Sequence, residues 1–164
     1  MSTLPILKKI LYVTDLGKQT RPVFRYAVSL ARQYGADLLM LHVVEPLGPT
    51  GQFIIETFLD EEAVQRFSKE GQREVLERMK ERLRLFCEEE MDSCSPDEPL
   101  VTEILVASGE PSEEILRIAD KHGADCIVIG TSTHGLLGGR KMGSTARRVT
   151  RHSRVPVFLV PNNI

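Results

Sequence analysis

Aromatic side chains are scarce in this sequence: they make up 5% of the 164 residues, and tryptophan is absent. Proteins that bind single-stranded nucleic acid commonly stack aromatic side chains on the bases, so this composition disfavours that function. Long apolar runs are missing as well, and none approaches the roughly 18 residues that a membrane-spanning helix needs. Residues 1–9 lack the charged and then apolar order of a signal peptide. We therefore expect neither a membrane protein nor a secreted one.

The sequence also lacks an excess of charge and a pattern of metal-binding cysteines. Its 21 basic and 23 acidic residues give a net charge of −2, which disfavours a broadly basic, nucleic-acid-binding protein. The three cysteines, Cys87, Cys94 and Cys126, have no metal-ligand spacing and predict free thiols in a reducing compartment. We therefore expect a cytoplasmic protein. A chain of this length and average composition can bury the core of one domain.

Short apolar runs alternate with amphipathic stretches along most of the chain. The runs that predict buried strands are residues 10–13, 38–44, 100–107, 126–129 and 155–160. Helical spacing of apolar residues predicts helices that begin near Thr20, Pro111 and Ser144. Strands that are apolar on both faces and alternate with helices imply a parallel sheet covered on both sides. We predict an α/β, Rossmann-like, doubly wound domain over residues 1–164, with its ligand crevice at the carboxyl ends of the strands.

Residues 46–99 interrupt this alternation. Their first part, Gly48 to Gly51, predicts a flexible or turn-rich segment. Residues 60–90 are highly charged with helical spacing, which predicts one long helix or two shorter ones. The segment has too few apolar residues to bury a second core, so we expect a long helical crossover between strands two and three. The alternative is a protruding arm that binds a partner.

A glycine-rich segment, residues 130–144, lies between a predicted buried strand and a predicted helix. Its glycines are Gly130, Gly135, Gly138, Gly139 and Gly143. Glycines let backbone N–H groups approach a ligand closely, and a helix N-terminus favours an anion. Hydroxyl donors from Ser132, Thr133, Ser144 and Thr145 would complete a phosphate-binding loop. The pattern is neither a Walker A loop nor a dinucleotide fingerprint, and a surface loop before a Ser-capped helix explains it as well.

The order and spacing of these segments resemble the universal stress protein family over nearly the whole chain. The family's nucleotide-binding branch carries the motif Gly-x2-Gly-x9-Gly-(Ser/Thr). Gly130 and Gly143-Ser144 match its first and last positions, whereas Thr133 stands in the second glycine slot and Gly135 could replace it in a shifted loop. A residue other than glycine is strained there if the slot needs a positive φ. Residues 10–15, 41–46, 109–111 and 148–160 also resemble family signatures, with Val13 in place of a usual proline and Asp15 retained.

This resemblance implies a five-stranded parallel sheet of order 3-2-1-4-5 and ATP, alone or with Mg²⁺, as the bound cofactor. It implies adenine and ribose near Asp15 and the backbone of Val43, and phosphates near Gly130 and the start of the last helix. The candidate binding residues are Val13, Asp15, Val43, Gly130, Thr133, Gly135, Gly143, Ser144 and Thr145. It also implies a homodimer that pairs through the C-terminal edge strand, Val157–Val160, whose open backbone groups invite a partner strand.

Three functional hypotheses follow. The first is an ATP-binding sensor or regulator in a stress response, without a dedicated enzymatic activity. The alternatives are a nucleotide-independent dimeric interaction module of the same fold and a slow ATP hydrolase. No Ser-His-Asp, Cys-His or paired metal-ligand arrangement is apparent in the spacing, so no catalytic residue is assigned. Two features stay open. Asp15 could bind ribose or only form a turn, and the six basic residues of 140–154 could attract phosphate, contact nucleic acid or simply be solvated.

Overall fold

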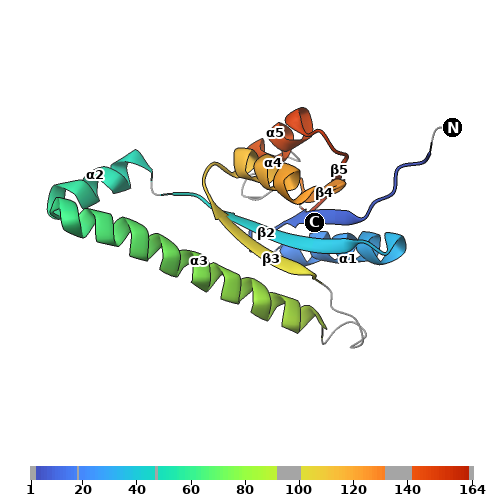
Figure 1. Ribbon diagram of the computed structural model, residues 1–164, viewed down its shortest axis with the longest axis horizontal. Helices are drawn as coiled ribbons and strands as arrows, with labels where there is room; N and C mark the ends of the chain where they lie inside the picture. The colour runs from blue at the N-terminus through green and yellow to red at the C-terminus, as the bar shows by residue number, and fades with distance from the viewer. Residues whose placement is uncertain (1–2, 18, 47, 92–100, 132–141, 163–164) are drawn as a thin grey trace.

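The computed structural model describes residues 3–17, 19–46, 48–91, 101–131 and 142–162, and these form a five-stranded parallel sheet with flanking helices (Figure 1). The strand order is β3-β2-β1-β4-β5, which confirms the predicted order 3-2-1-4-5. The pairs β1–β2, β2–β3, β1–β4 and β4–β5 all run parallel. The strands are β1 (Lys9–Val13), β2 (Asp37–Val44), β3 (Glu103–Ser108), β4 (Cys126–Gly130) and β5 (Val157–Val160).

Each face of the sheet has its own apolar core, because successive strand side chains point to opposite faces. On one face, Ile10, Tyr12 and Met40 pack with residues of α1 (Thr20–Tyr34) and the end of α3 (Glu61–Met91). On the other, Leu11 and Leu41 pack with residues of α4 (Pro111–His122) and α5 (Ser144–His152). The doubly wound arrangement predicted from continuous apolar strands is confirmed.

The same helix-to-strand junction occurs twice. Gly35 ends α1 and Gly123 ends α4, with φ values of 60° and 64° that favour glycine. At each junction the following alanine donates its N–H to the carbonyl five residues earlier, at 2.8 Å and 2.9 Å. The N–H groups of Asp37 and Asp125 then pair with the backbone of residues 8–9. The repeated Gly-Ala-Asp sequence therefore marks a repeated structural unit that starts β2 and β4 beside β1.

Two helices, α2 (Pro49–Phe58) and α3, connect β2 to β3. The expectation of a flexible or turn-rich segment at Gly48–Gly51 is wrong, because α2 begins at Pro49. Proline is favoured in the first turn of a helix. Helix α3 is continuous over 31 residues, so the long helix is the correct alternative. Asp60 precedes its first residue and caps it, accepting the N–H of Ala63 on Oδ1 at 2.7 Å.

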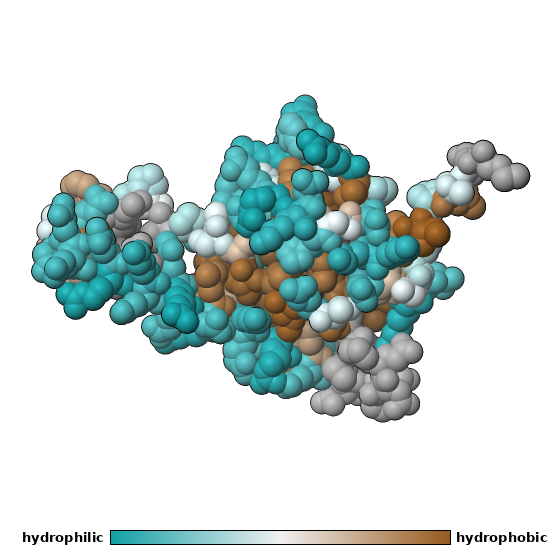
Figure 2. All heavy atoms as spheres, viewed as in Figure 1, coloured by the Kyte–Doolittle hydropathy of each residue, from teal (hydrophilic) through white to brown (hydrophobic). Residues whose placement is uncertain are grey.

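Only the C-terminal part of α3 is anchored to the sheet side of the molecule. There the side chains of Leu83 and Cys87 are buried. Glu90 is fully buried as well, with Oε1 2.9 Å from Nη1 of Arg21 and Oε2 3.2 Å from Nε of Arg25, both on α1. The N-terminal part of α3 and the attached α2 extend away from the sheet (Figure 1). Figure 2 shows that this extension is mainly hydrophilic, whereas apolar atoms gather over the sheet. Among the described residues, no helix is both long and apolar enough to cross a membrane.

Candidate functional site

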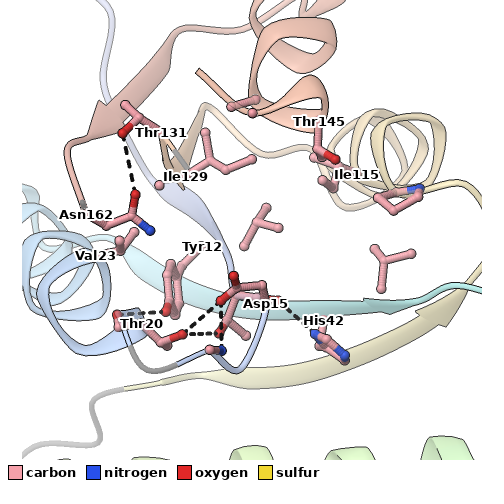
Figure 3. Close-up of a pocket in the computed structure, with 18 of the residues that line it drawn as sticks. Tyr12, Asp15, Thr20, Val23, His42, Ile115, Ile129, Thr131, Thr145 and Asn162 are labelled. Carbon is pink, nitrogen blue, oxygen red and sulfur yellow. Dashed lines mark hydrogen bonds between the residues drawn. The ribbon is translucent and has the colours of Figure 1, made fainter. Parts of the chain in front are cut away.

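A pocket of about 440 Å³ opens at the carboxyl edge of the sheet. Its walls come from the ends of β1, β2 and β4 and from the first turns of α1, α4 and α5 (Figure 3). Met79 of α3 and Asn162, two residues after β5, complete them. Parallel α/β sheets bind ligands at this edge, as the sequence predicted for this chain.

Asp15 lies two residues after the end of β1 and borders the pocket. Its Oδ1 accepts a hydrogen bond from the N–H of Gly17 at 2.9 Å and another from the hydroxyl of Thr20 at 3.0 Å. Between them, Leu16 has a φ of 59°, which is uncommon for a residue other than glycine. The turn suggested for Asp15 is therefore present, and it holds the carboxylate at the pocket; ribose binding by Asp15 stays a prediction.

The end of β2 offers backbone groups to the pocket. The last backbone hydrogen bond between the first two strands runs from the N–H of Thr14 to the carbonyl of Leu41, at 2.9 Å. Val43 lies two residues further along β2, so its N–H and C=O face the same side as those of Leu41, beyond the end of β1. No described residue pairs with them there, because the carbonyl of Thr14 instead lies 2.8 Å from His42 Nδ1. One donor and one acceptor of the Val43 backbone thus face the pocket.

The first turn of α5 forms the opposite wall. Gly143 precedes the helix, and its N–H donates to the carbonyl of Thr131 at 2.7 Å. That N–H is therefore occupied, and the open donors of the first turn are the N–H groups of Ser144, Thr145 and Ala146. Thr145 lines the pocket with its side chain, whereas Ser144 is exposed and is not part of the wall. A helix start of this kind is a favourable place for an anion.

Gly130 ends β4 in contact with a side chain from the C-terminal segment. A Cβ on Gly130 would lie 2.7 Å from Nδ2 of Asn162, which is closer than such atoms approach in proteins. Asn162 is buried, and its Oδ1 lies 3.4 Å from the hydroxyl of Thr131. The absence of a side chain at Gly130 therefore makes room for Asn162 beside the pocket.

Comparison with known proteins gives the family. The family model "Universal stress protein family" matches residues 7–161. The chain is also 30% identical to universal stress protein YxiE of Bacillus subtilis over 163 residues, which span 94% of this chain and 99% of YxiE. The chain belongs to the universal stress protein family.

Solved structures agree with this assignment. The structure of MJ0577, a universal stress protein of Methanocaldococcus jannaschii, superposes with a TM-score of 0.72 at 23% identity and covers 98% of this chain and 99% of that one. A universal stress protein in complex with cAMP superposes with a TM-score of 0.54 at 21% identity, covering 97% and 100% of the two chains. One from Archaeoglobus fulgidus in complex with dAMP gives 0.50 at 22%, covering 93% and 96%. At these identities the likeness shows the shared fold.

Most of the nucleotide-binding candidates of this universal stress protein lie around this pocket. Val13, Asp15, Val43, Gly130, Gly143 and Thr145 all line it. Ser144 is adjacent but outside the wall, and Thr133 and Gly135 lie outside the described residues. The role of Thr133 in the second glycine slot therefore stays a prediction. Arg140 and Lys141 also lie outside the described residues, whereas Arg148 pairs with Glu110 at 3.2 Å.

The site residues predicted from the sequence leave out many that line the pocket of this universal stress protein, among them Gly17, Thr20, Met79 and Asn162. Gly17 and Thr20 follow Asp15 closely enough to have suggested a turn around its carboxylate. Met79 and Asn162 are brought in by the long crossover and by the tail after β5, and no local pattern marks them. Within the described residues, no group of three or more His, Cys, Asp or Glu side chains is arranged to hold a metal ion.

Proposed function

We propose that this chain binds an adenine nucleotide, with ATP as the candidate, and acts as a nucleotide-responsive regulator in a stress response. The observation that carries the proposal is the pocket itself, which combines a carboxylate, an open strand backbone and a helix N-terminus around one cavity of about 440 Å³. This volume falls in the range of about 300–1,000 Å³ typical of small-molecule sites. Relatives solved in complex with cAMP and dAMP support the adenine nucleotide class.

Each wall suits one part of a nucleotide. The carboxylate of Asp15 can accept hydrogen bonds from ribose hydroxyls. The N–H and C=O of Val43 match the acceptor and donor on the edge of adenine. The first turn of α5, with the hydroxyl of Thr145, offers donors to phosphate oxygens. ATP would bring Mg²⁺ as a counterion held largely by its own phosphates and water, which needs no dedicated cluster of protein ligands.

Isothermal titration with ATP, in the presence and absence of Mg²⁺, tests the proposal. We expect saturable binding with one site per chain, and weaker binding of GTP because its base edge presents the reverse order of donor and acceptor to Val43. The matched variant Asp15→Asn keeps the shape of the side chain and removes its charge, and should weaken ATP binding about tenfold, since hydrogen bonds to charged groups contribute most. Absence of saturation at millimolar ATP would contradict the proposal.

We further propose a homodimer that pairs through β5. This strand lies at the edge of the sheet, and Phe158 on it is exposed next to Tyr26 of α1, with ring centroids 6.2 Å apart. An apolar, open edge strand supports pairing with a second copy. Sedimentation should give a dimer at micromolar concentration, and Phe158→Glu should give a monomer that still binds ATP. A monomeric unmodified protein would contradict the dimer without affecting the nucleotide proposal.

The two alternative functions predict different results when nucleotide binding and ATP hydrolysis are measured. A nucleotide-independent interaction module predicts no heat of ATP binding and no nucleotide carried through purification. A slow ATP hydrolase predicts phosphate release that falls when Gly143, at the start of α5, is replaced by a bulky residue. The pocket is lined by Asp15, His42 and Glu45, but Nδ1 of His42 lies 2.8 Å from the carbonyl of Thr14 and we assign the carboxylate of Asp15 to ribose. We therefore favour binding without dedicated hydrolysis.

A further inference from the structure

We propose that Thr20 is a positioning residue: its hydroxyl fixes the carboxylate of Asp15 so that the second oxygen is held for a ribose hydroxyl. The inference rests on the proposed function and assigns the source of its selectivity for ribose over 2′-deoxyribose. The two oxygens of the Asp15 carboxylate differ in their hydrogen-bond partners. Oδ1 accepts from the hydroxyl of Thr20 at 3.0 Å and from the N–H of Gly17 at 2.9 Å. Among the described residues, none donates to Oδ2, and Figure 3 shows the free end of the carboxylate directed into the pocket.

Thr20 is well held itself. It is the first residue of α1 and is 5% exposed, although the Asp15 that it contacts is exposed. Its carbonyl accepts a hydrogen bond from the hydroxyl of Tyr12 at 3.3 Å. Burial raises the pKa of Tyr12 above its ordinary value, so this hydroxyl stays protonated and remains a donor. The backbone N–H of Thr20 donates to the carbonyl of Gly17 at 3.2 Å, which closes the turn after Asp15.

A short chain of hydrogen bonds sets the direction of the Thr20 hydroxyl. The N–H of Leu16 donates to Oγ1 of Thr14 at 3.1 Å. The hydroxyl of Thr14 points to Oγ1 of Thr20 at 3.5 Å, at the long end of hydrogen-bond distance. The hydroxyl of Thr20 then donates to Asp15 at 3.0 Å. Donors aligned in one direction polarise one another, and here the chain of donors ends on a carboxylate.

Gly17 provides a second, independent constraint on the same carboxylate. A Cβ on this residue would lie 3.1 Å from Oδ1 and 3.2 Å from Oδ2 of Asp15. Such distances require the carboxylate to shift by a few tenths of an ångström, so the absence of a side chain at Gly17 leaves the carboxylate in the position where Thr20 contacts it. The carboxylate is thus ordered before a ligand arrives, which reduces the entropy that binding must remove.

Fixing Oδ1 has a consequence for selectivity. A freely rotating carboxylate could contact whichever sugar hydroxyl remains, whereas a fixed one presents Oδ2 in one direction. A site built to accept from a particular hydroxyl loses binding when the ligand lacks that hydroxyl, because the acceptor is then left desolvated and unpaired. We therefore expect the unmodified protein to prefer ATP to 2′-deoxy-ATP by about tenfold or more.

The test compares Thr20→Val with Thr20→Ser by titration with ATP and with 2′-deoxy-ATP. Valine keeps the branched shape and removes the donor, whereas serine keeps the donor. We expect Thr20→Val to bind ATP about tenfold more weakly and to bind 2′-deoxy-ATP nearly unchanged, so that the preference is lost. Thr20→Ser should retain most of it. Gly17→Ala should reproduce the loss by displacing the carboxylate.

The outcomes separate this inference from the proposed function. Equal losses of ATP and 2′-deoxy-ATP binding in Thr20→Val would mean that Thr20 only supports the fold, and would overturn the inference. So would an unchanged preference in a variant that melts like the unmodified protein. Binding of both nucleotides by the unmodified protein with no preference would overturn the inference and leave the proposed function standing. Failure of both to bind would contradict the proposed function and this inference with it.

Discussion

The side chain of Asn162 occupies the space that a Cβ on Gly130 would need, with Nδ2 only 2.7 Å from that position. Gly130 ends β4 and Asn162 follows β5, so the contact ties together the ends of two neighbouring strands at the edge of the pocket. A glycine expected to admit a phosphate thus has a packing reason as well. The contact also means that the C-terminal segment belongs to the wall of the candidate nucleotide site.

Gly130→Ala should lower the free energy of unfolding by about 1–2 kcal/mol, because the added methyl group must displace a buried amide. In the double variant with Asn162→Gly, the alanine no longer meets the amide. The cost of Gly130→Ala should then largely disappear, with a coupling of about 1 kcal/mol in a double-mutant cycle measured by urea unfolding. Strictly additive effects would show that the two residues do not compete for this space.

The free energy of unfolding should fall more when the arginine partners of Glu90 are removed than when the charge of Glu90 itself is removed. Glu90 is fully buried on α3, whereas Arg21 and Arg25 on α1 are about half exposed. Removing both arginines leaves an uncompensated charge inside the protein, and should cost about 3 kcal/mol or more. Glu90→Gln leaves two arginines that can turn to water, and should cost less than half as much. Urea unfolding of the three proteins gives the comparison, and the reverse order would contradict the account.

The thiols of Cys87 and Cys126 should be unreactive in the folded protein. Both are buried, and burial raises the pKa of Cys87 to about 11 and that of Cys126 above its ordinary value. The thiolate is the reactive form, so little of it is present at pH 7. In a Cys94→Ser variant, the two remaining thiols should react with a thiol reagent only at the rate of unfolding. In denaturant, both thiols of each chain should react. Rapid reaction of either thiol under native conditions would show that α3 or β4 is less well packed than described.

The start of α4 should make stability sensitive to acid. Glu110 precedes this helix, and hydrogen bonds from the hydroxyl of Ser112 and the N–H of Glu113 hold the pKa of its carboxyl below the ordinary value. A carboxyl with a lowered pKa in the folded state stabilises the protein above its unfolded pKa, about 4.3, and this contribution is lost as the pH falls through the folded value. Glu110→Gln should therefore lower the free energy of unfolding at pH 7 by about 1 kcal/mol or less.

The pH dependence of that difference is the control. The gap between the unmodified protein and Glu110→Gln, measured by urea unfolding, should shrink as the pH falls below about 4.3. A difference that stays constant between pH 7 and acid would show that the charge of Glu110 does not stabilise the helix. Arg148, which pairs with Glu110 at 3.2 Å, offers a further comparison through Arg148→Met.

Much of this fold can be predicted from local sequence. Strands such as residues 38–44 are apolar on both faces, and the Gly35 and Gly123 junctions carry the residues that their backbone angles require. Asp15 and Val43 could be assigned to the site because residues at the carboxyl ends of parallel strands meet at one edge. The helix α2 could not be foreseen, since glycines around Pro49 suggest a turn and the helix gains its support from contacts with α3. Asn162 could not be foreseen either, because its place depends on where β5 ends relative to β4.

The structure of the protein crystallised with saturating ATP tests the central claim most directly. The account predicts density for the nucleotide at the carboxyl edge of the sheet, with ribose beside Asp15, the base against the backbone of Val43, and phosphates at the first turn of α5. Density for ATP at another surface, or a pocket that stays without nucleotide at saturating concentration, would contradict it.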